Sequence, residues 1–130
     1  MSVVLLDTTV LIDILRGRPV LDRLRVLRSR ADVVATSDVN VEEVIRGLHP
    51  AEQTSADDLF DGLLVVTINR AVGERAGAWR RDYARRGTTL SQADCLIAAA
   101  AAGVGGRLAT GNPRHFPMPD LAVEHWPVGS

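Results

Sequence analysis

The length, composition and charge of the chain exclude several classes of protein. Its 130 residues suffice for one domain, 1–130, with a proper core, and a hydrophobic content of 46 % argues against disorder. No apolar run is long enough to cross a membrane, and no basic segment precedes an apolar one at the N-terminus. The single cysteine, Cys95, excludes an internal disulfide and a multi-cysteine zinc site. We therefore expect a cytoplasmic globular protein without membrane association.

The charged residues narrow the possible chemistry further. The net charge of −1 arises from 15 basic and 16 acidic residues, which is not a global electrostatic footprint for nucleic acid. All of the basic residues are arginine, and the sequence contains no lysine. Mechanisms that need a catalytic lysine, such as P-loop phosphate binding and Schiff-base chemistry, are therefore excluded.

In the first half of the chain, apolar runs predict strands that alternate with helices. Residues 3–6 predict a short buried strand, and helical spacing then continues to Gly17, where Gly17-Arg18-Pro19 breaks the helix. Pro19 suits the first turn of a second helix. The next predicted elements are a strand at 32–36, a short helix at 39–46, an acidic helix at 51–63 and a strand at 64–68.

The second half continues the same alternation. Asn69 is a suitable N-cap for a long helix that ends at Gly87, and Ser91 begins a helix that is apolar on nearly every side. A strand at 107–110 and a short edge strand at 122–125 complete the prediction. We predict an α/β fold with three layers, α/β/α, in which helices cover both faces of a central parallel sheet of four to five strands.

Three acids stand where this fold would bring distant segments together. Asp7 ends the first strand, Glu43 lies in the helix after the second, and Asp94 lies in the first turn of the apolar helix. Helix starts gather over one edge of a parallel sheet, where ligands bind. Each acid also has a structural explanation: Asp7 could cap its helix, while the pairs Asn40–Glu43 and Ser91–Asp94 have the spacing of a capping box.

Asp94 favours the functional explanation over the structural one. It stands beside Cys95 at the start of a helix that should be buried, and a carboxylate there is costly unless a positive charge pairs with it. Without lysine, the partner is an arginine or a metal cation. A cation shared by the three acids explains all of them, and Mg²⁺ prefers such oxygen ligands and suits phosphodiester hydrolysis.

Four segments carry a resemblance to a known family. The segments are LLDTTVLID (5–13), VEEVIRG (41–47), LSQADCLIAAAA (90–101) and LATGNPRHF (108–116). In order and spacing they resemble the PIN-domain nucleases, and most closely the VapC toxins of bacterial type II toxin–antitoxin pairs. The resemblance runs from the first strand to about Phe116 and so covers nearly the whole chain.

The resemblance implies a Mg²⁺-dependent endoribonuclease, with Mn²⁺ as a possible substitute. Asp7, Glu43 and Asp94 match the first three acids of the family's metal-binding quartet, and Thr9 matches the residue that supports the first acid. The fourth acid is replaced by Asn112, which weakens the case for a second tightly held metal because an amide brings no charge. The resemblance further implies a homodimer and a cognate antitoxin protein, with DNA contacted only through the antitoxin.

Several other residues have weaker claims to a role. Arg114, and Arg80 and Arg81 on the long helix, could contact RNA phosphates, although clustered arginines more often form a solvated face or a partner surface. His115 could serve as a base. Asp13 is expected to face solvent or to form a salt bridge.

A binding module and a phosphatase are the two alternatives to a nuclease. Asn112 favours a PIN-like binding module whose site has decayed and which acts through its dimer or partner surface. A phosphatase of the haloacid-dehalogenase type also begins with an acid after its first strand. That enzyme needs an Asp where Thr9 stands and a catalytic lysine, so the sequence argues against it.

Overall fold

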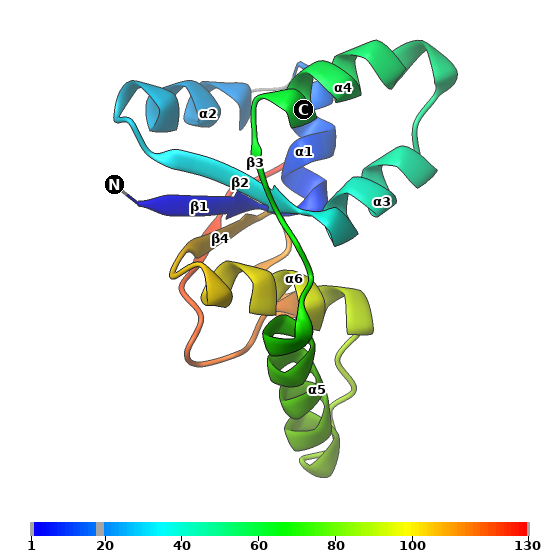
Figure 1. Ribbon diagram of the computed structural model, residues 1–130, viewed down its shortest axis with the longest axis vertical. Helices are drawn as coiled ribbons and strands as arrows, with labels where there is room; N and C mark the ends of the chain where they lie inside the picture. Colours follow the sequence, from blue (N-terminus) through cyan, green and yellow to red (C-terminus); the bar gives the residue numbers. More distant parts are fainter. Residues whose placement is uncertain (1, 18–19, 130) are drawn as a thin grey trace.

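A fully parallel sheet of five strands forms the centre of the computed structural model, which describes residues 2–17 and 20–129 (Figure 1). The spatial order of the strands is β3-β2-β1-β4-β5. Their bounds are β1 Val3–Leu6, β2 Val33–Ser37, β3 Leu64–Val66, β4 Arg107–Thr110 and β5 Val123–His125. The first strand is thus central, and the chain adds strands to both of its sides.

Helices cover both faces of this sheet. In Figure 1, α1 to α4 lie above the sheet, α6 lies below it, and α5 projects downward away from the body. The α-helices are α1 Thr8–Leu15, α2 Val20–Ser29, α3 Asp38–Arg46, α4 Gln53–Asp61, α5 Arg70–Arg85 and α6 Gln92–Gly103, and the 3₁₀ turns are η1 Pro50–Glu52 and η2 Pro113–His115. The predicted three-layer α/β/α fold is confirmed.

Alternate side chains of the central strands pack into two separate cores. Val4 and Leu6 of β1 belong to the core on the side of α1 and α2, whereas Leu5 belongs to the core on the side of α5 and α6. In β4, Ala109 belongs to the core on the side of α1 and α2, and Leu108 belongs to the core on the side of α5 and α6. Strands buried on both faces need apolar residues at every position, which explains the continuous apolar run of β1.

The alanine-rich helix α6 is buried as predicted. Cys95, Ile97 and residues 98–101 are each at most 1 % exposed. They pack in one cluster with Leu5 of the sheet and with Trp79 of α5. The small alanine side chains allow α6 to lie close to both neighbours, so the start of this helix is held firmly over the sheet.

The helix caps agree with prediction in two places and differ in a third. Asn69 accepts a hydrogen bond from the Val72 N–H at 3.0 Å, and Ser91 caps α6. The predicted capping box of Asn40 and Glu43 is wrong, because Ser37 caps α3 and Asn40 is its reciprocal partner. The helix begins at Asp38, one residue earlier than its apolar periodicity indicated, since Ser37 at the end of β2 already supplies the cap.

Some predicted boundaries shift, and one prediction cannot be compared. The acidic helix at 51–63 begins as η1 and ends at Asp61, and the strand at 64–68 is limited to Leu64–Val66. Gly17, at a φ of 65°, follows the end of α1. The break at Arg18 and the helix start at Pro19 lie outside the described residues.

The expectation that Asp13 faces solvent is wrong. Its side chain is buried, with 3 % of the residue exposed, and it accepts a hydrogen bond from the Gly129 N–H at 2.7 Å. The C-terminal segment after β5 returns to α1 and covers this position, which the local pattern of α1 does not reveal. Within residues 2–17 and 20–129, none of the helices is long and apolar enough to cross a membrane.

Candidate active site

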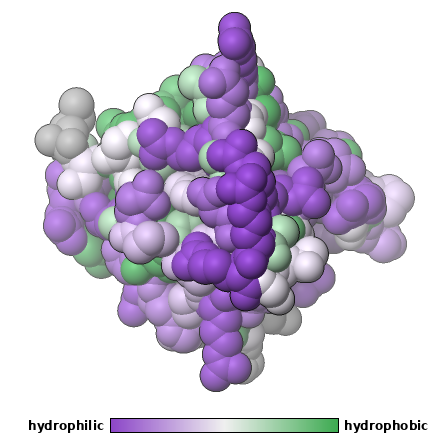
Figure 2. Space-filling model, turned by 90° about the horizontal axis from the view of Figure 1, so that it is seen from below, coloured by the Kyte–Doolittle hydropathy of each residue, from purple (hydrophilic) through white to green (hydrophobic). Residues whose placement is uncertain are grey.

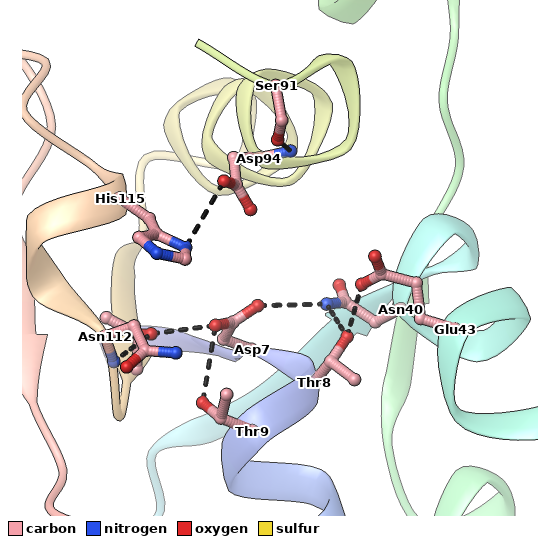
Figure 3. Close-up of polar contacts among 10 residues, drawn as sticks. Asp7, Thr8, Thr9, Asn40, Glu43, Ser91, Asp94, Asn112 and His115 are labelled. Carbon is pink, nitrogen blue, oxygen red and sulfur yellow. Dashed lines mark hydrogen bonds and ion pairs between the residues drawn. The ribbon is translucent and has the colours of Figure 1, made fainter. Parts of the chain in front are cut away.

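Asp7 lies at the centre of a polar cluster at the carboxyl end of β1 (Figure 3). Only 6 % of the residue is exposed. Its Oδ2 accepts hydrogen bonds from the Thr110 hydroxyl at 2.7 Å and from the Thr9 hydroxyl at 3.4 Å. Its N–H donates to the Ala109 carbonyl at 2.9 Å, so the backbone of Asp7 continues the pairing of β1 with β4.

Thr9 and Thr110 connect this carboxylate to the turn after β4. The Thr9 hydroxyl accepts the Gly111 N–H, and the Thr110 hydroxyl accepts the Asn112 N–H, both at 3.0 Å. Each threonine thus donates to Asp7 and accepts from the turn. A Cβ on Gly111 would lie 3.2 Å from the Thr9 hydroxyl and 2.6 Å from a Val128 methyl group, so the close approach favours glycine.

Asn40 is a site residue that the sequence analysis missed. It is fully buried on α3, and its Nδ2 donates to Thr8 Oγ1 at 3.0 Å and to Asp7 Oδ1 at 3.5 Å. Its Oδ1 accepts from the hydroxyl and the N–H of Ser37 at 2.6 and 3.1 Å, which fixes the orientation of the amide. The Ser37-x-x-Asn40 spacing was the available signal, because it predicts a cap and therefore a constrained amide.

Glu43 joins the cluster through Thr8. The Thr8 hydroxyl donates to Glu43 Oε1 at 2.6 Å, and the same hydroxyl accepts from Asn40. Glu43 lies three residues beyond Asn40 on α3, so both side chains project from one face of that helix. A continuous chain of hydrogen bonds therefore runs from Asp7 through Asn40 and Thr8 to Glu43 (Figure 3).

Asp94 approaches the cluster from the opposite layer. It lies in the first turn of α6, where its N–H donates to the Ser91 hydroxyl at 3.0 Å. Its side chain is 25 % exposed, and its Oδ2 lies 3.5 Å from Nδ1 of His115. Figure 3 shows Asp94 and Asp7 facing a common gap between the start of α6 and the end of β1.

Burial and neighbouring acids disfavour the charged form of Asp7. Loss of hydration raises the pKa of Asp7, and the charges of Asp94 and Glu43 raise it further, although hydrogen bonds from Thr110 and from the Thr8 backbone act in the opposite direction. A cation between the carboxylates would offset the loss of hydration of Asp7 and its repulsion by Asp94 and Glu43. The oxygen-rich donor set therefore suits a hard divalent ion.

The carboxylates do not form a closed cage. Among the described residues, no group of three or more His, Cys, Asp or Glu side chains is arranged to hold a metal ion by itself. Mg²⁺ does not require such a cage, since it keeps several waters and takes only one or two direct carboxylates. The residues present thus fit Mg²⁺ or Mn²⁺ better than an ion that needs an all-protein shell.

Asn112 and His115 occupy the rim beside these acids. Asn112 is exposed and lies next to Asp7 in Figure 3, with its backbone N–H bound to Thr110. His115 follows on η2 and faces Asp94. The position at which the family resemblance implies a fourth acid therefore lies at the site, and the amide of Asn112 occupies it.

The predicted arginines do not join the acid cluster as a group. Arg80 donates through Nε to the Leu90 carbonyl at 3.3 Å, and Arg81 pairs with its exposed neighbour Asp82 at 3.5 Å. Arg114 is exposed on η2, beside His115. Of the three arginines, Arg114 is the one whose neighbour in the chain, His115 on η2, faces Asp94.

The fold and the site together define a class of protein. It is an α/β/α protein with carboxylates and amides at the carboxyl end of its central strands, where the sheet adds strands on either side of β1. The chain belongs to the PIN-domain family, whose model matches residues 4–120.

Curated relatives agree over nearly the whole length of the chain. Ribonuclease VapC19 of Mycobacterium tuberculosis is 32 % identical over 119 residues, which cover 90 % of this chain and 95 % of the relative. Ribonuclease VapC10 of the same species is 36 % identical over 116 residues, which cover 88 % of this chain and 86 % of the relative.

Solved structures agree with the fold. A DNA-bound VapBC from Salmonella typhimurium superimposes with a TM-score of 0.84 at 26 % identity, covering 97 % of this chain and 99 % of that chain. VapBC2 from Rickettsia felis, bound to a DNA fragment from its promoter, gives a TM-score of 0.86 at 21 % identity and covers 96 % and 99 %.

Proposed function

We propose that the protein is a metal-dependent endoribonuclease and the toxin of a VapBC-type toxin–antitoxin pair. The observation that carries the proposal is the convergence of Asp7 and Asp94 from opposite layers on one gap, with the pKa of Asp7 raised by burial and by neighbouring acids. Relatives that match about nine tenths of the chain are named ribonucleases, which supports the same chemistry.

The residues divide into ligands and supports. Asp7 and Asp94 are the direct ligands of Mg²⁺ or Mn²⁺, and Glu43 binds through water or orients the attacking water. A bound divalent ion lowers the pKa of the attacking water and offsets charge that develops on the phosphate. Thr9 holds Asp7 in position with its hydroxyl, and Asn112 completes the polar rim.

Asn112 sets the expected number of metal ions. A second ion close to the first would need further negative charge, because two divalent cations about 3.5–4 Å apart repel each other. The neutral amide of Asn112 supplies none, so the proposal includes one tightly held ion. Asn112 can still contact a metal-bound water or the substrate through its amide.

The partners follow from the relatives and from one exposed strand. Structural neighbours are VapBC complexes, which supports a small antitoxin as partner and DNA contact through that antitoxin. Leu64 and Val65 on the edge strand β3 are 50 % and 38 % exposed, and such an edge supports a homodimer because a second chain would cover it. We propose that the protein acts in the cytoplasm, where its RNA substrate is.

Cleavage of a structured RNA by the purified full chain tests the enzyme. We expect cleavage in Mg²⁺ or Mn²⁺, none in EDTA, and loss of activity in Asp7→Asn. Asp58→Asn, which alters an exposed acid on α4, serves as the matched control and retains activity. Cleavage that survives in EDTA or in Asp7→Asn would falsify the proposal.

Asn112 also supports the second candidate, a binding module without catalysis. In that case the chain cleaves no RNA in any divalent metal, yet it still forms a stable complex with the antitoxin. Size-exclusion chromatography of the mixed proteins, alongside the cleavage assay, separates the two candidates.

A further inference from the structure

A short strap, residues 126–129, connects the end of β4 to helix α1. At its start the Trp126 N–H donates to the Thr110 carbonyl at 2.9 Å, and Trp126 is only 1 % exposed. At its other end the Gly129 N–H donates to Oδ2 of Asp13, a buried residue of α1, at 2.7 Å. The strap therefore holds together two elements that lie far apart in the sequence.

Val128 lies within the strap and packs against the turn after β4. A Cβ on Gly111 would lie 2.6 and 2.9 Å from the two methyl groups of Val128, so the strap passes directly over the backbone of this turn. The face from which α5 projects is largely hydrophilic (Figure 2), and large exposed apolar side chains are few in the part of the chain that the structure describes. Val128 is one of them, and its contact with Gly111 accounts for an apolar residue at this exposed position.

The two elements that the strap connects are the ones that hold Asp7. Thr110 of β4 donates to Asp7 Oδ2 at 2.7 Å, and Thr9 of α1 donates to the same oxygen at 3.4 Å. The Gly111 N–H donates to Thr9 Oγ1 at 3.0 Å, so the turn that Val128 covers also fixes this hydroxyl. An O–H···O hydrogen bond is usually about 2.5–3.0 Å long. The longer bond from Thr9 is therefore sensitive to the spacing between α1 and the turn.

We propose that Val128 is a positioning residue for Asp7, and that the strap keeps α1 and the turn after β4 at the spacing that lets Thr9 reach the carboxylate. Val128 acts through Gly111 and Thr9 and is not itself a catalytic residue. The inference rests on the endoribonuclease function proposed above. It adds a segment outside the acid cluster on which the geometry of the cluster depends.

Amide hydrogen exchange tests the contact without metal or activity. In the metal-free full chain, Val128→Ala should speed exchange of the Gly111 N–H by at least about twofold, the lower limit of coupling between residues in contact. Exchange of the Val72 N–H, which is bonded to the Asn69 side chain on α5, should stay the same. The matched control is Val26→Ala, which truncates a valine of α2 that is 53 % exposed and should alter neither amide.

Mg²⁺ binding tests whether the effect reaches Asp7. Isothermal titration calorimetry, at a temperature at which every variant is folded, should give a Kd about three- to tenfold higher for Val128→Ala. This is less than the 10- to 100-fold typical of a residue bonded directly to a metal ligand. In a Thr9→Val background the hydroxyl link is absent, so Val128→Ala should add little. Full additivity of the two substitutions overturns the proposal, because Val128 would then act independently of Thr9.

Three outcomes separate failure of the positioning role from failure of the function. If the unaltered chain cleaves RNA and Val128→Ala lowers kcat with little change in KM, the role is supported. If the chain cleaves RNA, and Val128→Ala leaves Gly111 exchange and the Kd for Mg²⁺ unchanged, the role is wrong and the nuclease stands. If the unaltered chain neither binds Mg²⁺ nor cleaves RNA in Mg²⁺ or Mn²⁺, the function fails and the positioning role with it.

Discussion

Asn40 directs its amide nitrogen toward the Asp7 carboxylate at 3.5 Å, while its oxygen is held by Ser37. The residue that completes the cap of α3 therefore also orients the central acid of the site. The amide cannot rotate without breaking both bonds to Ser37, so α3 and the carboxyl end of β1 are fixed relative to each other.

Replacing Asn40 with alanine should damage both stability and activity. The change removes the buried acceptor of the Ser37 hydroxyl and N–H and the amide that donates to Thr8, and we expect a loss of roughly 2 kcal/mol in the free energy of unfolding. Because Asp7 and Thr8 lose the donor that orients them, kcat/KM for RNA cleavage should fall by about 10- to 100-fold, as for other residues that orient metal ligands. Urea denaturation and initial cleavage rates measure the two effects.

A control for this change is Gln53→Ala. It also removes a helical amide, but one that is exposed and bonded to the exposed Asp57 at 2.9 Å. It should alter neither quantity appreciably. If Asn40→Ala behaves like this control, the network between α3 and β1 contributes less than its geometry indicates.

Asp7→Asn should make the metal-free protein more stable at neutral pH. Burial in the folded state raises the pKa of Asp7. At a pH above that pKa, ionisation of this carboxylate therefore lowers the free energy of unfolding. Removing the charge should therefore stabilise the fold at pH 7, which a higher Tm in EDTA would show. The difference should shrink as the pH falls through the folded-state pKa, because the carboxyl of the unaltered chain then becomes neutral. A lower Tm for Asp7→Asn in EDTA at pH 7 contradicts this account.

Mg²⁺ should raise the Tm of the unaltered chain and not that of Asp7→Asn. An ion that binds only the folded state stabilises it by about 2.7 kcal/mol at 100 times its Kd. A titration of Tm against Mg²⁺ concentration measures the effect, with Asp58→Asn as a control that should respond normally. No shift in the unaltered chain up to millimolar Mg²⁺ would exclude Asp7 as a ligand of a tightly held ion.

Glu124 should contribute to stability at neutral pH and lose that contribution in acid. Burial opposes its ionisation, but hydrogen bonds from Trp126 and Arg107, with the charges of Arg107 and Arg23, outweigh burial and lower its pKa. A carboxyl with a lowered folded-state pKa stabilises the fold above its unfolded pKa, and the effect disappears as the pH falls through the folded value. Glu124→Gln should therefore reduce Tm at pH 7 and have little effect in strong acid. Since 39 % of the side chain is exposed, the loss should stay below about 1 kcal/mol.

The layers of the fold were predictable because each depends on a local pattern. The apolar run of β1, the apolar surface of α6 and the caps at Asn69 and Ser91 all act within a few residues of the chain. The position of Asp13 depended on contact with Gly129, which lies 116 residues away. No local pattern in α1 could indicate that contact.

The acids of the candidate site were predictable from the sequence, but the residues that orient them were not. Asp7 and Asp94 stand at the ends of predicted elements, and Glu43 lies in the short helix after the second strand, so the parallel sheet alone predicts that they approach one edge. Asn40 and Thr110 were missed because polar residues at such positions usually serve as caps or strand ends. Their role depends on the direction of a side chain, which only the packed structure determines.

The backbone of Asp7 is part of the pairing between β1 and β4, and this restricts how the protein can be controlled. The acid cannot be withdrawn by the swing of a loop, because moving it would separate the two central strands of the sheet. A site built in this way is permanently assembled once the chain has folded. For the proposed nuclease we therefore expect control from outside, through a partner that covers the gap or through the supply of the proposed cation.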